Sequence, residues 1–295
     1  MSEHDRLAEH FESHRTHLRA VAYRMLGSVA EAEDAVQDAW LRLSRAEAAE
    51  IQNLAAWLTT VVARVCLNIL RTRKTHPEQT TGVHMPDPIV SRSDAAPTPE
   101  EEALLSDSVG LAMLVVLDTL GPAERLSFVL HDMFAVPFDD IAPIVGRTAT
   151  ATRQLASRAR RRVQEAAPSP DGDAARQREI VDAFYAASRD GDFEALVSLL
   201  DPDVVLRADG GTGMPALSMV LSGAHTIASQ ASMWRRFVPH VWPATINGMP
   251  GVVVAPEGRT MSVMSFTVVD GRVAAIDVLA DPERIAALGL AEWRV

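Results

Sequence analysis

The chain of 295 residues carries a formal net charge of −11 and a single cysteine, Cys66, which excludes an internal disulfide framework. No apolar run approaches the ~18 residues of a membrane span, and the charged N-terminus lacks the apolar core of a signal peptide, so a cytoplasmic protein without a membrane partner is expected. The acidic balance argues against strong binding to naked DNA, because that affinity grows with the number of phosphates that a protein neutralises.

A bundle of helices is predicted for residues 1–76. Apolar residues recur at helical spacing from residue 6 to about residue 26, from 35 to 43 and from about 53 to 70. Ser28 is the expected N-cap of the second helix, and Glu31, three residues on, would complete a capping box. The third helix ends in Arg71-Thr72-Arg73-Lys74, where positive charge suits the negative end of the helix dipole.

Residues 77–100 are predicted to be an acidic linker, because five prolines occur there with few apolar residues. Helical patterning returns in residues 101–167 and is interrupted at Gly121-Pro122. Residues 168–174 form a second, shorter linker.

The segment 135–162 has the pattern of a helix-turn-helix. A short amphipathic helix is followed by Gly146-Arg147-Thr148 as a tight turn, and then by a helix with short polar side chains first and arginines after them. That order suits a recognition helix whose N-terminal end enters the major groove while the later arginines, up to Arg162, contact phosphates. A solvated basic helix gives the same pattern and is the alternative.

An α+β domain is predicted for residues 175–295. Helices are expected at 175–189, 193–200 and 222–237, and strands at 204–208, 241–246, 252–255, 260–269 and 272–279, where Val, Ile and Thr are frequent. Asp270-Gly271 predicts a hairpin with a type I′ turn between the last two strands. The expected structure is a layer of helices on a curved antiparallel sheet.

Several motifs resemble one family in order and spacing. AYRMLGS (22–28), AEDAVQDAWLR (32–42) and AWLTTVVARVCLNILRTRK (56–74) are similar to region 2 of extracytoplasmic-function (ECF) sigma factors, which are DNA-binding subunits of bacterial RNA polymerase. LGPAERLSFVLHDMF (120–134) and the helix-turn-helix resemble region 4. The resemblance covers about residues 6–165 and implies two partners, core RNA polymerase (its β′ clamp helices and β flap) and promoter DNA.

The resemblance also implies roles for named residues. In region 2 the second helix would dock on the polymerase through Glu31, Asp34, Asp38 and Trp40, with Glu33 beside them. Acids that merely stabilise the N-terminus of a helix would give the same pattern. The −10 promoter element, whose bases leave the stack as the duplex opens, would be bound by Arg64, Asn68, Arg71, Arg73 and Lys74. Trp57 either stacks on a base or lies in the core among its apolar neighbours.

Region 4 would read the −35 element through its recognition helix. The residues expected to contact DNA there are Thr148, Thr150, Thr152, Arg153, Gln154, Ser157, Arg158, Arg160 and Arg161.

The last 120 residues resemble the SnoaL-like, NTF2-like fold, a cone of sheet and helices around a pocket, in the motifs at 180–206 and 266–285. The whole chain thus resembles the sigma J-like subfamily of ECF sigma factors. That subfamily carries a Pro-Glu-Pro-like motif in the linker and an Asp-Gly-Gly-Gly motif in the tail. This chain has near matches to both motifs, and their residues are therefore expected to make regulatory contacts: Pro86, Asp87, Pro88, Asp209, Gly210 and Gly211. Thr212 interrupts the glycine run, and plain turns are the alternative.

The tail is interpreted as a regulator that contacts region 2 or the linker. Two alternatives remain: a sensor of an unidentified small ligand, and a SnoaL-type isomerase or cyclase, for which Asp209, His225 and His240 are acid–base candidates by residue type only. No spacing demands catalysis or metal binding. The prediction is therefore a multidomain, non-enzymatic sigma factor without cofactor or metal, with two all-α sigma domains and an α+β NTF2-like cone.

Overall fold

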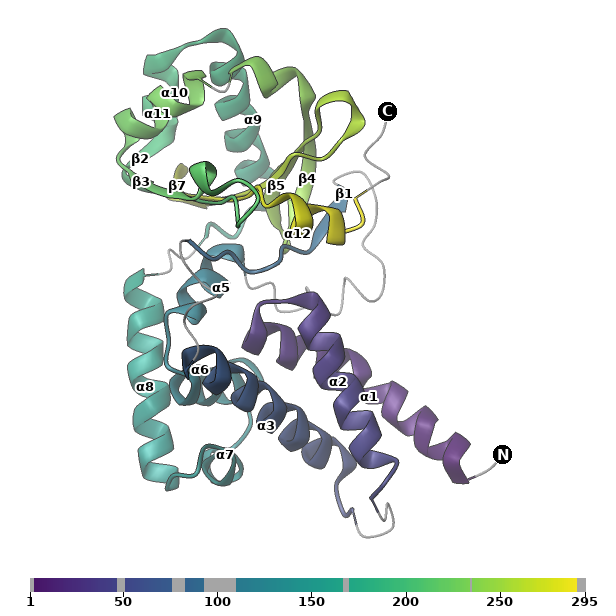
Figure 1. Ribbon diagram of the computed structural model, residues 1–295. Coiled ribbons are helices and arrows are strands. Elements are labelled where there is room, and N and C mark those ends of the chain that lie inside the picture. The colour runs from purple at the N-terminus through teal and green to yellow at the C-terminus, as the bar shows by residue number, and fades with distance from the viewer. Residues whose placement is uncertain are drawn as a thin grey trace. The chain divides into compact units, whose positions relative to one another are not determined.

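The computed structural model describes residues 3–46, 51–75, 83–92, 110–166, 170–233 and 235–290. Contacts divide these residues into two units. The helical unit comprises the described residues up to 75 together with 116–166, and the tail unit comprises 83–92, 110–115 and 170–290. Figure 1 labels the elements of both units.

Three helices form the first half of the helical unit: α1 (Glu3–Leu26), α2 (Val29–Leu43) and α3 (Leu54–Thr75). The chain turns between α1 and α2 at Gly27, which has a left-handed φ of 71°. Ser28 caps α2 as predicted, since its side chain accepts the Glu31 amide at 3.5 Å. The Glu31 carboxylate pairs with Arg73 instead of completing the capping box.

By length and composition, α3 is apolar enough to cross a membrane, which corrects the expectation that no stretch approaches this limit. Leu58, Val62 and Leu67 on its inner face are buried, and α3 packs against α1 and α2. The core helix of a helical bundle meets the same criterion, so this property does not distinguish the two environments.

The second half of the helical unit begins in α5 (Leu111–Asp118), of which only the last three residues belong to this unit. It continues through α6 (Pro122–Phe128), the π-helical turn η3 (Val129–Met133), α7 (Phe138–Val145) and α8 (Ala149–Ala166). Arg125 is 2% exposed, pairs with Asp118 and donates to the carbonyl oxygen of Arg24 at 3.2 Å. Because Arg24 lies on α1, this buried guanidinium joins the two halves of the unit.

The tail unit is α+β, as predicted. Its helices are α9 (Ala174–Asp190), α10 (Phe193–Leu199), α11 (Ala224–Met233) and α12 (Pro282–Ala287). Its strands are β1 (Val90–Arg92), β2 (Leu200–Asp209), β3 (Met219–Ser222), β4 (Val241–Ile246), β5 (Met249–Val254), β6 (Ser262–Val269) and β7 (Arg272–Leu279). They form one sheet in the order β1-β4-β5-β6-β7-β2-β3, in which only β2 and β7 are parallel neighbours. Figure 1 shows α9, α10 and α11 on one face of this bent sheet.

Most of the expected strands of the tail lie within observed ones. The hairpin is confirmed, because Asp270 and Gly271 both have positive φ angles, 50° and 74°, as a type I′ turn requires. The helix expected at 222–237 is shorter, since Ser222 ends β3 and α11 begins at Ala224. Strands β1 and β3 were not predicted, and β1 comes from the segment predicted to be linker.

Candidate functional site

The recognition helix α8 has a polar surface, and most of the residues predicted to read the −35 element lie on it. Gly146 ends α7 in the left-handed conformation, φ 71°, and Thr148 caps α8 by accepting the Ala151 amide at 3.2 Å. The following side chains are exposed: Thr148, Thr150, Arg153, Gln154, Ser157, Arg158 and Arg161. The fold therefore presents the N-terminal half of α8 as a helix-turn-helix requires.

Thr152 is the exception, and its predicted contact with DNA is wrong. Its side chain is 0% exposed and donates to the carbonyl oxygen of Thr148 at 2.9 Å. Helical periodicity explains the error: positions 152, 156 and 159 share the buried face of α8. Alternating threonines cannot all face DNA when the spacing of one face is three to four residues.

Acidic neighbours within region 4 pair with the later arginines of α8. Arg158 and Arg162 share the carboxylate of Glu124, at 3.3 and 3.0 Å, and Arg160 pairs with Asp132. The three arginine side chains are 51%, 53% and 42% exposed, so each pair contributes about 0–1 kcal/mol. Phosphates can replace such weak partners.

The residues predicted to bind the −10 element separate into two groups in α3. Arg64, Asn68, Arg71 and Lys74 are exposed. Arg73 instead turns back into the bundle, where it pairs with Glu31 and donates to the carbonyl oxygen of Leu26 at 3.2 Å. Arg73 and Glu31 were expected to contact DNA and polymerase, respectively. Their pairing ties the end of α3 to the start of α2; the two side chains are 37% and 36% exposed, and both expected contacts stay predictions.

Trp57 and Arg64 line a cleft whose opposite wall belongs to region 4. Phe134, Pro137 and Ile144 contribute to that wall. Within the helical unit, this part of the surface predicted to bind the −10 element thus faces region 4, which is predicted to read the −35 element.

The outer face of α2 carries the residues expected to contact polymerase. Asp34 is exposed, whereas Asp38 accepts a hydrogen bond from Arg42 at 2.9 Å. Glu33 pairs with Arg15 and Arg19 of α1, and the Trp40 ring lies 5.1 Å from that of Phe11. Glu33 and Trp40 therefore have a structural role, since they hold α2 against α1 by ion pairs and ring packing.

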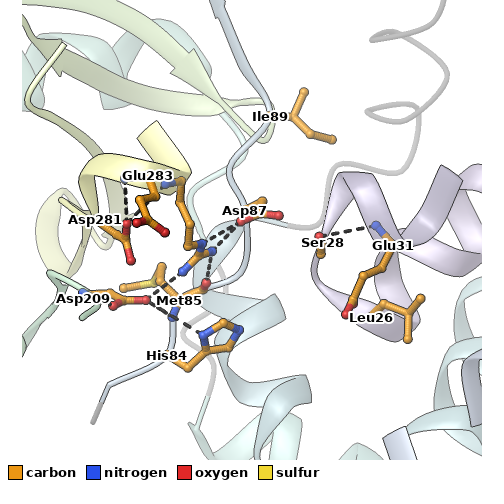
Figure 2. A network of polar contacts seen from close by, with 12 residues as sticks. Leu26, Ser28, Glu31, His84, Met85, Asp87, Ile89, Asp209, Asp281 and Glu283 are labelled. Atoms are coloured by element: carbon orange, nitrogen blue, oxygen red, sulfur yellow. Dashed lines mark hydrogen bonds and ion pairs between the residues drawn. The ribbon is translucent and has the colours of Figure 1, made fainter. Parts of the chain in front are cut away.

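In the tail unit, the predicted linker and glycine motifs meet. Asp209, 4% exposed, accepts a hydrogen bond from the Met85 amide at 2.8 Å and from Arg284 Nη1 at 2.8 Å (Figure 2). Arg284 also pairs with Asp87 and donates to the carbonyl oxygen of Met85. One arginine thus joins both motifs, and its part was missed because it lies outside them in the sequence.

A second contact fixes the linker four residues further on. The Ile89 amide donates to Asn247 Oδ1 at 3.0 Å, and the Asn247 amide donates to the carbonyl oxygen of Ile89 at 2.8 Å. Val90–Arg92 then pairs with β4 as an edge strand. Pro86 and Pro88 are buried. We call Asp209, Asn247 and Arg284 the linker-binding site.

Two glycines beside Asp209 are required by close approach of other atoms. A Cβ at Gly210 would lie 2.0 Å from the carbonyl oxygen of Met214, and one at Gly211, where φ is +57°, would lie 1.6 Å from Asp281 Oδ2. Asp281 caps α12 by accepting the Glu283 and Arg284 amides. Thr212 is exposed, which explains why the glycine run can be interrupted there.

The remaining acid–base candidates do not converge. His225 is exposed beside Phe193, with ring centroids 6.0 Å apart, and Asp209 is occupied by the linker. A cavity lies between the helices and the sheet of the tail, and neither residue nor His240 lines it. Among the described residues, no group of three or more His, Cys, Asp or Glu is placed to bind a metal.

Comparison with known proteins gives a consistent result. Residues 10–76 match the family model for Sigma-70 region 2. The chain is 38% identical to the ECF RNA polymerase sigma factor SigJ of Mycobacterium tuberculosis, over 96% of this chain and 95% of that one, and 33% identical to the probable ECF sigma factor SigI of the same species, over 97% of both. The crystal structure of SigJ is similar with a TM-score of 0.78 and 36% identity, covering 95% of this chain and 98% of that chain.

Proposed function

The chain belongs to the extracytoplasmic-function RNA polymerase sigma factors, and on this premise we propose that its own tail controls when it initiates transcription. In this proposal the tail keeps the linker bound in the inactive chain. Release of the linker allows region 2 and region 4 to engage polymerase and promoter. As a factor that acts with RNA polymerase, the protein works in the cytoplasm.

The observation that carries the proposal is the contact between the linker and the linker-binding site. Asp209 and Arg284 contact Met85 and Asp87, and Asn247 contacts Ile89 with two hydrogen bonds. In this family the linker is expected to run through the polymerase channel toward the RNA exit. The same backbone amides cannot be bound by the tail and follow that path, so the two states compete.

The helical unit supports a closed inactive state. Region 2 and region 4 belong to one compact unit and share a cleft. The −10 and −35 elements are about 25 base pairs apart, which is roughly 80 Å of duplex at about 34–36 Å per turn. Two packed regions cannot span that length, so they must separate before both elements are read.

We assign the DNA and polymerase contacts to the surfaces that remain exposed. The −10 element is bound by Arg64, Asn68, Arg71 and Lys74 of α3. The −35 element is read by the exposed N-terminal half of α8, with Arg158, Arg160 and Arg161 on phosphates. Asp34 and Asp38 of α2 are the acidic contacts to polymerase.

The tail acts by binding and not by catalysis in this proposal. Its cavity is lined by no carboxylate, histidine, lysine or arginine among the described residues. Acid–base chemistry of the isomerase type needs such a group within hydrogen-bond reach of the substrate.

Run-off transcription with bacterial core polymerase on a selected promoter library tests the proposal. The full chain is compared with Arg284→Met, which breaks the linker contact, and with Arg176→Met, which removes an exposed arginine of α9. Promoter-specific transcripts are expected from all three, with a several-fold increase only in Arg284→Met. Lower activity in Arg284→Met, with a folded protein by circular dichroism, would show that the bound linker is the active state and overturn the proposal.

A further inference from the structure

The tail contains a partly open cavity that the sigma-factor function does not explain. It has a volume of about 160 Å³ and lies between α9, α11 and the concave face of the sheet. Its walls are mostly apolar, with Phe184, Leu206, Ile276 and Val278 among the lining residues; the polar lining residues are Tyr185, Ser188, Gln230 and Ser262. A dry cavity of about 150 Å³ with such walls binds benzene, so the space matches a small organic molecule in size.

One buried polar atom in the wall is left without a partner. Ser188 of α9 is 3% exposed, and its hydroxyl makes no hydrogen bond with any described residue. A serine in a helix ordinarily satisfies its hydroxyl on the preceding turn, and an unsatisfied buried hydroxyl is unfavourable. Beside it, the Tyr185 hydroxyl donates to the thioether sulfur of Met264 at 3.4 Å, and a thioether is a weak acceptor. Both groups line the cavity.

The occupant is expected to be uncharged, because the described lining residues carry no charged side chain. The described lining residues include no basic side chain that would neutralise an anion and no carboxylate that would neutralise a cation. The nearest buried acid on β7, Asp277, alternates with the cavity-facing Ile276 and Val278 and pairs with Arg207 at 3.1 Å. An unpaired charge in such surroundings is strongly disfavoured.

We propose that this cavity binds an uncharged, largely apolar small molecule, about the size of a monocyclic aromatic compound, which makes a hydrogen bond to Ser188. The described lining residues include no carboxylate, histidine, lysine or arginine for acid–base chemistry, so in this proposal the molecule is a ligand and not a substrate.

Three wall segments run directly into the linker-binding site. Ala208 lines the cavity and precedes Asp209; Ala280 lines it and precedes Asp281, the N-cap of α12, which carries Arg284. Leu217 and Met219 line it on either side of Ser218, whose hydroxyl accepts the Gly210 amide at 3.1 Å. An occupant that displaces these walls therefore alters the affinity of the site for the linker. This coupling rests on the proposed function, whereas binding itself does not.

A titration of the full chain with benzene, phenol and benzoate, followed by ligand-observed NMR, tests the binding. Benzene and phenol are expected to bind saturably at one site, and benzoate at least ~100-fold more weakly because its charge would be buried unpaired. Ser188→Ala should lower the affinity for phenol by about 5- to 10-fold and leave the affinity for benzene unchanged. Equal affinity of benzoate, or no saturable binding of either neutral probe, overturns the proposal.

Two cavity-filling variants provide the control. Ala231→Phe on α11 and Val278→Phe on β7 are both expected to abolish phenol binding, and thermal unfolding identifies whichever variant remains folded. Unchanged binding in a folded variant places the ligand elsewhere and overturns the site. The coupling is tested separately by hydrogen exchange of the linker amides with and without phenol. Unchanged exchange at saturation overturns the coupling alone, while the transcription comparison of Arg284→Met tests the linker contact.

Discussion

Arg284→Met should release the linker from the tail in the free protein. The guanidinium donates to Asp209 at 2.8 Å and also contacts Asp87 and the carbonyl oxygen of Met85. Its loss leaves Asp209, 4% exposed, with the Met85 and Gly211 amides as donors and with His84 Nδ1 at 4.0 Å. Removing a hydrogen bond to a charged group costs about 1.5–3 kcal/mol. Because the Arg284 side chain is 22% exposed, we expect the substitution to destabilise the linker-bound state by about 2 kcal/mol. At 1.36 kcal/mol per tenfold change, the open state becomes ~30-fold more populated.

Hydrogen–deuterium exchange of residues 83–92 measures this population directly. The Met85 and Ile89 amides, which are bonded to Asp209 and Asn247, should exchange ~30-fold faster in Arg284→Met. The matched variant Arg176→Met should leave their exchange unchanged. If the two amides keep their protection in Arg284→Met while the core of the tail stays protected, Arg284 does not hold the linker and the argument fails.

Three further outcomes are expected. Burial raises the pKa of the Cys66 thiol from 9.0 to about 12, so the thiol's contribution to stability is complete below pH 9 and is lost as pH rises toward 12. Between pH 8 and pH 10, the free energy of unfolding measured in urea should therefore fall by about 1.4 kcal/mol more in the unmodified chain than in Cys66→Ala. Gly211→Ala, whose Cβ would overlap the Asp281 carboxylate, should speed exchange of the linker amides, whereas Thr212→Ala should not; equal effects would contradict the close-approach argument. Thr152→Val should leave promoter preference unchanged because the side chain is buried, whereas Arg161→Ala should weaken promoter binding by the polymerase complex and lower its salt dependence by about one charge, measured by titration at several salt concentrations.

Local signals in the sequence predicted most of the fold. The turn at Asp270-Gly271, the Ser28 cap and the helix at 175–189 each depend on a few neighbouring residues, and each is present in the structure. The family motifs of regions 2 and 4 also lie within continuous stretches. Information of this kind survives without knowledge of the tertiary structure.

The linker contacts could be predicted only in outline. Pro86-Asp87-Pro88 and Asp209-Gly210-Gly211 were expected to be regulatory, but their common partner Arg284 lies 197 residues from Asp87 and carries no local signal. Strand β1 was missed because three residues of an acidic, proline-containing segment have no strand periodicity of their own and are ordered by pairing with β4.

The pairing of Arg73 with Glu31 could not be predicted for a related reason. Both residue types fit exposed roles, and sequence spacing places them 42 positions apart, so their pairing depends on how α3 packs against α2. A basic residue at the end of a helix and an acid at the start of another are each favourable locally. Only the packing shows that the same two charges neutralise one another.

The energetics of the cavity limit what kind of control the tail can exert. A ligand shifts a closed–open equilibrium only by the difference between its affinities for the two states. Converting a chain that is 99% closed into one that is 99% open requires about 5.5 kcal/mol of that difference. A ligand of about seven non-hydrogen atoms, at roughly 0.7 kcal/mol per atom, has only about 5 kcal/mol of binding free energy in total. It keeps part of this in both states, because wall residues such as Phe184 and Ile276 belong to the hydrophobic core of the tail and not to the linker-binding site. A differential of about 1.4–2.7 kcal/mol, or 10- to 100-fold, is the realistic range. A ligand in this cavity therefore adjusts transcription by degrees, and full activation requires polymerase itself to compete for the linker.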